Sequence, residues 1–103
     1  MPFAIVLAPQ AIEDFKRLKA HLRSGLRDAL ETHLRHEPSK TSRSRIKRLR
    51  GLRQPQYRLR VGDIRVFYDV AGSVVEILAI VTKVTSAQWL ETEGKMDEDR
   101  SAQ

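Results

Sequence analysis

The sequence contains no cysteine, which excludes a disulfide framework, a thiolate metal site and a cysteine nucleophile. It also has no apolar run near the roughly 20 residues that a membrane-spanning helix needs. The longest such run is Ile77 to Val81, with Val74 and Val75 just before it. The N-terminus, MPFAIVLAPQ, has no basic lead and no long apolar core, so it is not expected to be a signal peptide. These absences predict a cytoplasmic protein with no membrane partner.

Several kinds of catalytic site are missing as well. There is no glycine-rich phosphate loop and no zinc-type spacing, so neither a metal nor another cofactor is expected. Asp69 and Glu76 are the only acids in the later apolar segments, and two acids make at most a weak metal site. His21, His33 and His36 all lie in a segment of helical periodicity, with His33 expected at the edge of the core. A histidine acid–base pair in the strands is therefore not expected.

What the chain does have is positive charge, concentrated in one segment. Its 103 residues suit a single domain, predicted over residues 1–94 with a polar, frayed tail at 95–103. Nineteen Lys or Arg against thirteen Asp or Glu give a net charge of +6. Residues 40–65 hold ten of the basic residues and one acid, whereas residues 91–100 hold five acids and two bases. This distribution points to an anionic partner.

The first third of the chain predicts a strand followed by two helices. Residues 3–7 form a short β-type run, and Pro9 suits the first turn of a helix. An amphipathic stripe with spacings of three and four residues follows, formed by Ile12, Phe15, Leu18, Leu22, Leu26, Leu30 and Leu34. Ser24-Gly25 is expected to divide this stripe into a helical hairpin, which ends before Pro38.

From Ile46 onward the periodicity becomes that of strands. Residues 57–61 and 64–70 alternate, and Gly62-Asp63 between them reads as a two-residue hairpin turn. Residues 74–81 are mostly apolar on both faces of the expected strand, which predicts that the strand is covered on both sides. Thr85 or Ser86 is expected to cap a last short helix over residues 87–93. The fold class is therefore α+β: a small, mainly antiparallel sheet packed on one face by an N-terminal helical hairpin, with a short C-terminal helix.

The hairpin places arginines together. If Gly62-Asp63 is the turn, Arg60 lies opposite Arg65 and Arg58 lies opposite Phe67, all pointing away from the helices. Two opposed arginines repel by roughly a few tenths of a kcal/mol. Guanidinium groups gathered in this way suit the binding of phosphate oxygens, which they grip in pairs. The alternative is a solvated positive face that only aids solubility.

Three further features extend this region. Lys83 ends the last apolar strand, where it either joins the rim of the arginine face or simply reaches solvent. The run RSRIKRLRGLR, residues 43–53, is expected to be an electrostatic contact surface. Phe67 shares the predicted arginine face and is a candidate for stacking on a base.

At this point the residues match a known family. The stretch LRGLRQPQYRLRVGDIRVFYDV, followed by VVEILAIVTK, resembles the RelE/ParE toxin superfamily of bacterial toxin–antitoxin systems, and is closer to RelE. The N-terminal strand, the helix start at Pro9-Gln10-Ala11 and the helical hairpin fit as well. The resemblance covers about residues 3–91 and implies a small sheet wrapped on one side by a helical hairpin.

The resemblance implies a ribosome-dependent mRNA endoribonuclease that inhibits translation. In RelE-like toxins the 2′-hydroxyl of the RNA attacks the neighbouring phosphate, no metal is used, and cationic side chains on the sheet hold the RNA. By position, the family's site implies catalytic roles for Arg58, Arg60, Arg65 and Lys83. The implied RNA-binding residues are Arg45, Lys47, Arg48, Arg50, Arg53, Phe67 and Trp89.

The chain departs from the family prototype at two places. The family has lysines where this chain has Arg58 and Arg60, and an arginine stays protonated, so it clamps phosphate but is a poor general base. The prototype also has a tyrosine near the chain end that takes part in proton transfer. The matching region here is Gln88-Trp89-Leu90, which has no hydroxyl.

Three functions therefore stand side by side. The first is the ribosome-dependent nuclease, the second a ParE-like inhibitor of DNA gyrase, and the third an RNA- or ribosome-binding module without catalysis. The resemblance and the basic segment imply a small acidic antitoxin as partner in a toxin–antitoxin hetero-oligomer, with the ribosome and mRNA as targets. The alternative to a separate antitoxin is that the acidic stretch from Glu91 to Asp99 folds back as an internal mimic.

Overall fold

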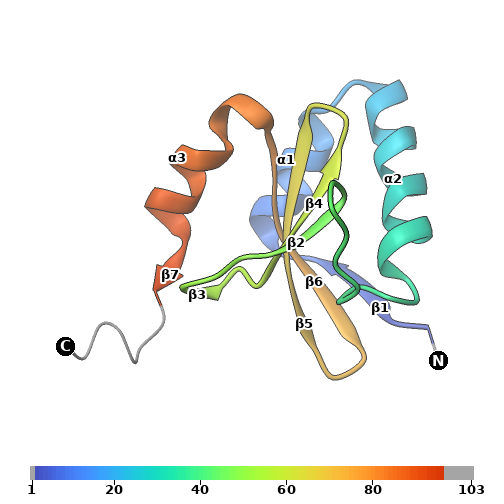
Figure 1. Cartoon of the computed structure of the whole chain (residues 1–103). Helices are drawn as coiled ribbons and strands as arrows, with labels where there is room; N and C mark the ends of the chain where they lie inside the picture. Colours follow the sequence, from blue (N-terminus) through green and yellow to red (C-terminus); the bar gives the residue numbers. More distant parts are fainter. Residues whose placement is uncertain (1, 97–103) are drawn as a thin grey trace.

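The computed structural model describes residues 2–96 (Figure 1). After a first strand that ends at Leu7, two helices precede the strand-rich half of the chain, as the periodicity predicts. The elements are β1 (Ala4–Leu7), α1 (Pro9–Arg17), α2 (Ala20–Leu34), β2 (Ile46–Arg48), β3 (Leu52–Gln54), β4 (Tyr57–Val61), β5 (Ile64–Ala71), β6 (Val74–Thr82), α3 (Lys83–Glu93) and β7 (Lys95–Met96).

The two N-terminal helices separate earlier than the sequence predicts. Leu18 and Lys19 have extended backbones, with ψ values of 147° and 153°, and they divide α1 from α2. Ser24 and Gly25 lie inside α2, so the break expected there was wrong. A glycine in a helix costs only about 1 kcal/mol relative to alanine. The burial of Leu26 against the sheet outweighs that cost, because packing rather than propensity decides where a helix continues.

The main sheet has five strands in the order β1-β6-β5-β4-β2. Strand β1 runs parallel to β6, and the other neighbours are antiparallel. The β4–β5 hairpin has the register that the two-residue turn predicts, with Arg60 opposite Arg65 and Arg58 opposite Phe67. Gly62 in the turn has φ +58°, a left-handed conformation that glycine adopts without strain.

The hydrophobic core lies between the sheet and the helical hairpin. Leu26 and Leu34 of α2 are fully or almost fully buried, as are Leu59 of β4 and Val66 of β5. Tyr68 is also buried, and its hydroxyl donates to the carbonyl oxygen of Pro38 at 2.6 Å, which ties the end of the hairpin to the sheet. The α+β fold expected from the sequence is confirmed.

A third helix covers part of the opposite face of the sheet. Helix α3 begins directly after β6 and lies on the other side of the sheet from α2 (Figure 1). It starts at Lys83, four residues before the predicted start, because Thr82 is the N-cap and accepts a hydrogen bond from the backbone N–H of Thr85. The prediction that Thr85 or Ser86 is the cap was wrong. Cover on both sides was expected over residues 74–81. It is found at Ala79 and Ile80, which are both buried, whereas Val74 and Glu76 in the first half of β6 are exposed.

After α3 the chain forms a last short strand, which pairs with β3 in a second, two-stranded sheet. Lys95 and Met96 form β7, which runs antiparallel to β3. These two residues were expected in the frayed tail, whereas the backbone pairing fixes them; the remainder of that tail, residues 97–103, lies outside the described residues. None of the helices within residues 2–96 is long and apolar enough to cross a membrane.

Candidate nucleic-acid interface

The β4–β5 hairpin brings three arginines to one face of the sheet. Arg58 and Arg60 are two residues apart on β4, so their side chains project to the same side. Arg65 is the direct cross-strand partner of Arg60 and shares that side. We call Arg58, Arg60 and Arg65 the arginine face. No carboxylate within residues 2–96 forms an ion pair with any of the three.

The three arginines differ sharply in exposure. Arg60 is exposed and Arg58 is half-buried, but Arg65 is only 6% exposed. One guanidinium nitrogen of Arg65, Nη1, donates to the carbonyl oxygens of Gly62 at 2.8 Å and Ile64 at 3.0 Å. The expectation that Arg65 is exposed was wrong, because its side chain folds back over the hairpin turn and braces it, and its catalytic role stays a prediction.

Arg58 is a partly buried cation with two cationic neighbours and one unpaired donor. Partial burial is the largest cause that lowers the pKa of Arg58, followed by the positive charges of Arg65 and Arg60. Its Nε is buried without a hydrogen-bond partner, the single such side-chain atom among the described residues. A buried donor without an acceptor costs free energy, and the two neighbouring cations add repulsion. An anion placed against this face would reduce the repulsion between the cations.

The aromatic residues on this face are already paired with each other. Phe67 is completely buried, and its ring stacks on the indole of Trp89 with centroids 4.9 Å apart and planes 6° apart. The expectation that Phe67 stacks on an RNA base is corrected, because the ring has no surface left for a base. Trp89 is half-buried and keeps part of its surface accessible.

Lys83 lies next to the turn of the hairpin. Its backbone N–H donates to the carbonyl oxygen of Asp63 at 2.7 Å, which fixes the start of α3 beside the turn. Its side chain is exposed. The backbone of Lys83 therefore lies beside the turn at the end of the arginine face. Whether its side chain joins that face or only reaches solvent stays a prediction.

The residues of the basic run do not all face the same way. Lys47 is the cross-strand partner of Arg58, so it extends the arginine face onto β2. Arg48 instead packs over the ring of Tyr57, at 5.2 Å, and donates to the carbonyl oxygen of Gln56 at 2.8 Å. Arg45 lines a separate hollow with His33 on the α2 side. Arg50 and Arg53 are exposed near β3.

Metal ligands and acid–base histidines are not part of this face. Within residues 2–96, no three His, Asp or Glu side chains are grouped closely enough to hold a metal ion. His33 is half-buried, as expected at the edge of the core, and partial burial followed by the charge of Arg45 lowers its pKa.

Asp69 has a structural role that sequence reasoning missed. Its Oδ2 accepts a hydrogen bond from Gln54 Nε2 at 2.7 Å, and its Oδ1 accepts one from the backbone N–H of Gln56 at 2.8 Å. Gln56 Oε1 in turn accepts from the backbone N–H of Val70 at 2.8 Å. These bonds hold the corner between β3 and β4, and thus the start of the strand that carries Arg58. The sequence signal for this structural role was the position of Asp69 as an isolated acid within an apolar strand.

Comparison with known proteins identifies the family. The model of the family described as the ParE toxin of type II toxin–antitoxin system, parDE, matches residues 5–83 of this chain. The chain belongs to the RelE/ParE toxin superfamily. The superfamily assignment made from the hairpin and basic motif is confirmed. No curated protein sequence matches the chain.

Solved structures of RelE toxins share the fold of this superfamily member. The toxin–antitoxin complex RelBE2 of Mycobacterium tuberculosis aligns with a TM-score of 0.66 and 21% identity, over 80% of this chain and 92% of that chain. A variant of the Escherichia coli toxin RelE in which two arginines are replaced by alanine, in the free state, aligns with a TM-score of 0.65 and 21% identity. The alignment covers 90% of this chain and 94% of that chain. The RelE–RelB complex of Pyrococcus horikoshii aligns with a TM-score of 0.61 and 26% identity, over 81% of this chain and 97% of that chain. Two of these toxins were thus crystallised with an antitoxin.

Proposed function

We propose that this toxin is a metal-independent endoribonuclease that cleaves mRNA on the ribosome. The observation that carries the proposal is the gathering of Arg58, Arg60 and Arg65 on one face of the sheet, where no carboxylate within residues 2–96 forms an ion pair with them. A phosphodiester supplies the oxygen acceptors and the negative charge that this face lacks. The proposal also rests on the family of the chain, whose structural relatives here are RelE toxins.

In the proposed reaction the 2′-hydroxyl oxygen attacks the adjacent phosphorus. The bond from phosphorus to the 5′-oxygen breaks, which leaves a cyclic phosphate and a free 5′-hydroxyl. Arg58 and Arg60 hold the non-bridging oxygens and stabilise the charge that gathers on them in the transition state. Arg65 contributes positive charge and holds the turn, and the ammonium of Lys83, at the start of α3, donates the proton that the 5′-oxygen takes up as it leaves.

Proton transfer is the step for which the arginine face is least equipped. Arginines do not give up their protons near neutral pH, and no histidine lies in β4, β5 or β6. The 2′-hydroxyl proton therefore passes to a group of the ribosome or the RNA, which makes the reaction ribosome-dependent. Naked RNA is expected to remain intact with this protein.

The second candidate function is inhibition of DNA gyrase. The family model that matches is the ParE model, and Trp89 stands where the RelE prototype has a proton-transferring tyrosine. Both observations favour a target that needs no nuclease chemistry. The third candidate, an RNA- or ribosome-binding module, needs the same cationic face without catalysis.

One experiment distinguishes the three. The protein is added to translating ribosomes and, in parallel, to a gyrase supercoiling reaction, and mRNA 5′ ends are mapped. Cuts at fixed codon positions with 5′-hydroxyl ends support the nuclease. Loss of supercoiling without cuts would establish the gyrase inhibitor, and ribosome binding without either would establish the binding module.

The partner we propose is an acidic antitoxin. Related toxins crystallised with RelB proteins support a hetero-oligomer, and the surplus of charge in residues 40–65 supports an acidic, amphipathic inhibitor segment. Such a segment would cover the arginine face by charge and by apolar burial. The self-inhibition alternative involves Glu91 and Glu93 of α3 together with acids at 97–99, which lie outside the described residues. Inhibition by a separate antitoxin should survive deletion of residues 95–103.

A further inference from the structure

A hollow of about 270 Å³ lies on the helical side of the molecule, at the β2 edge of the sheet. One wall is the last turn of α2, with Thr32 and His33, and the other is formed by residues 37–46, the loop that leads into β2. Ile46 lines it on the core side, since Ile46 is buried and its cross-strand partner Leu59 belongs to the core. We call this space the loop hollow. No residue of the arginine face lines it.

The loop hollow contains one positive charge without a partner. Lys40 lies 3.6 Å from the carboxylate of Glu37, so these two charges largely cancel. Arg45 is exposed and forms no ion pair among residues 2–96. Burial, followed by the charge of Arg45, lowers the pKa of His33, so its imidazole is neutral near pH 7. The charge available to a ligand is therefore that of Arg45.

The loop is held in shape by hydrogen bonds of its own. Ser42 Oγ accepts from the backbone N–H groups of Arg45 at 2.9 Å and Ile46 at 3.2 Å. The backbone N–H of Ser42 donates to the carbonyl oxygen of Ile46 at 2.9 Å. Both acceptor positions of the Ser42 hydroxyl are thus filled, and its O–H remains as a donor. Thr32 and Thr41 bring two further hydroxyls to the lining.

This combination of groups suits an anion. Hydroxyl donors beside an unpaired guanidinium supply charge-assisted hydrogen bonds to oxygen acceptors. The end of α2 opposes an anion only weakly, because a helix C-terminus carries about half a negative charge whereas Arg45 carries a full positive one. A water molecule takes about 30 Å³ of the liquid, so the loop hollow has room for a phosphate group with part of its sugars.

We propose that the loop hollow binds a phosphodiester group of an RNA backbone. A phosphodiester has one negative charge and two non-bridging oxygens, which the planar guanidinium of Arg45 can hold in a pair. Its single charge matches the one charge available in the lining. A phosphomonoester, such as a phosphoserine, carries nearly two negative charges at neutral pH, and the second would meet the carboxylate of Glu37.

The position of Arg45 connects the loop hollow to the arginine face. The backbone N–H of Arg60 donates to the carbonyl oxygen of Arg45 at 2.9 Å, so these residues are neighbours at the edge of the sheet. Lys47, two residues further on, lies opposite Arg58. An RNA strand on the arginine face therefore reaches the loop hollow by crossing β2 alone. The inference rests on the RNA-binding part of the proposed function and not on cleavage.

The ring signals of His33 in NMR spectra test the proposal, because His21 and His36 do not line the loop hollow. The full protein is titrated with dimethyl phosphate, a phosphodiester without a base, and separately with the neutral trimethyl phosphate. We expect a saturable shift of the His33 signals with dimethyl phosphate, with a Kd on the order of 10 mM for so small a ligand. The pKa of His33 should rise on binding, because a nearby anion favours the imidazolium. Trimethyl phosphate should cause neither change, and His21 should not respond.

Two matched variants and one longer probe locate the effect. Arg45→Gln should raise the Kd for dimethyl phosphate about three-fold, which is the range of an exposed ion pair. Lys19→Gln removes the same charge from an exposed position outside the lining and should leave the Kd unchanged. A single-stranded oligonucleotide with 2′-deoxyribose, which has no 2′-hydroxyl to attack the phosphate, should also shift the His33 signals. Arg45→Gln should reduce the magnitude of its salt slope by about 0.7.

Equal responses of His33 to the charged and the neutral ester, or equal Kd values for Arg45→Gln and Lys19→Gln, would overturn the proposal. A response to O-phosphoserine without one to the oligonucleotide would assign the loop hollow to a phosphoprotein and would overturn it too. Cleavage of mRNA by a protein whose His33 signals ignore dimethyl phosphate would refute this inference alone. A His33 response without cleavage would support it and count against the proposed nuclease.

Discussion

At the scale of single residues, three arginines that look alike in the sequence have three different environments. Arg60 is exposed, Arg65 is buried and donates to two carbonyl oxygens, and Arg58 is half-buried with an unpaired Nε. Sequence reasoning placed all three on one face through the register of the hairpin. It did not foresee that Arg65 turns back on its own backbone, because the path of a long side chain depends on which carbonyl groups are left without donors.

Replacing Arg58 by methionine should separate stability from activity. The apolar side chain removes a buried, unpaired donor, so the free energy of unfolding should rise by about 1 kcal/mol. The loss of a charge-stabilising group should lower the rate of ribosome-dependent cleavage by about 10²–10³-fold. Urea unfolding and the mapping of mRNA 5′ ends measure the two effects.

The control for Arg58→Met is Lys19→Met, at an exposed position between α1 and α2 and outside the basic run. It should leave the free energy of unfolding and the cleavage rate nearly unchanged. Full cleavage by a folded Arg58→Met protein would remove the arginine face from the proposed reaction.

Replacing Arg65 should instead destabilise the protein. Arg65→Ala leaves the carbonyl oxygens of Gly62 and Ile64 without their side-chain donor, which should lower the free energy of unfolding by about 1–2 kcal/mol. Arg60→Ala is the matched variant on the opposite strand and should change it by less than about 0.5 kcal/mol, because Arg60 is exposed. Denaturant titration of both proteins compares them, and equal stabilities would show that the brace contributes nothing.

At the scale of elements, local signals located the hairpin well and the helix boundaries less well. A two-residue turn with glycine first fixes the register of the strands on either side, so the opposition of Arg60 and Arg65 followed from Gly62-Asp63 alone. The boundary between α1 and α2 depends on where α1 finishes covering β6, and the start of α3 depends on where β6 leaves its pairing with β5. Neither is a local property.

Helix α3 should depend on one aromatic contact for its position. No residue of α3 is fully buried, and Trp89 makes its stacking contact with Phe67. Trp89→Ala should therefore speed hydrogen exchange of the α3 amides about ten-fold, in line with the free energy of an aromatic pair. Exchange in β5 and β6 should change little. Trp89→Phe should restore most of the protection, and a uniform increase across the sheet would show that the contact stabilises the whole domain instead.

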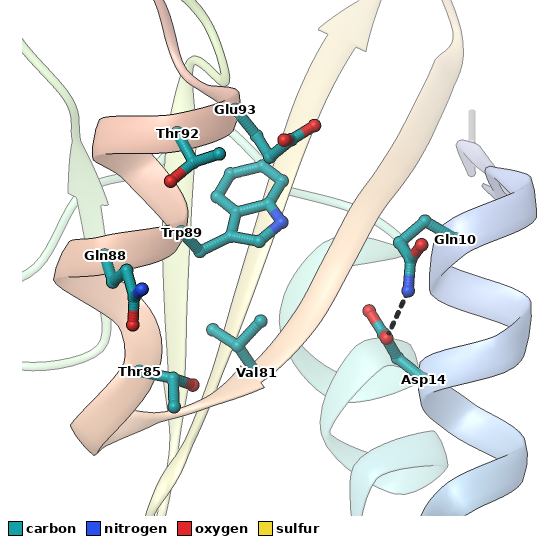
Figure 2. Close-up of a pocket in the computed structure, with 8 residues that line it drawn as sticks. All are labelled: Gln10, Asp14, Val81, Thr85, Gln88, Trp89, Thr92 and Glu93. Atoms are coloured by element: carbon teal, nitrogen blue, oxygen red, sulfur yellow. Dashed lines mark hydrogen bonds between the residues drawn. The ribbon is translucent and has the colours of Figure 1, made fainter.

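At the scale of the whole molecule, the positive charge is gathered on one face of the sheet. The arginine face extends onto β2 through Lys47. The groove lined by Val81 and Trp89 (Figure 2) adjoins it on the same side, because Val81 is the cross-strand partner of Arg65 and Trp89 stacks on Phe67. A net charge alone could not show where the cations lie.

Ribosome or RNA binding should weaken steeply as salt rises. If about five cations contact phosphates, the slope of log K against log salt should be about −3.5 for single-stranded RNA. A filter-binding titration at several salt concentrations gives this slope, and Arg60→Ala should reduce its magnitude by about 0.7. A flat response would indicate a protein target, such as gyrase.

The sequence by itself determined the fold class, the hairpin register and the family, because these depend on periodicity, turn chemistry and motif. The tertiary structure alone decided which cations are free. Phe67 and Trp89 are 22 positions apart in the sequence, and only the crossing of α3 over the sheet stacks them and withdraws Phe67 from any ligand. Arg65 and Arg58 likewise differ through burial, which is set by the packing of neighbours rather than by the identity of the residue.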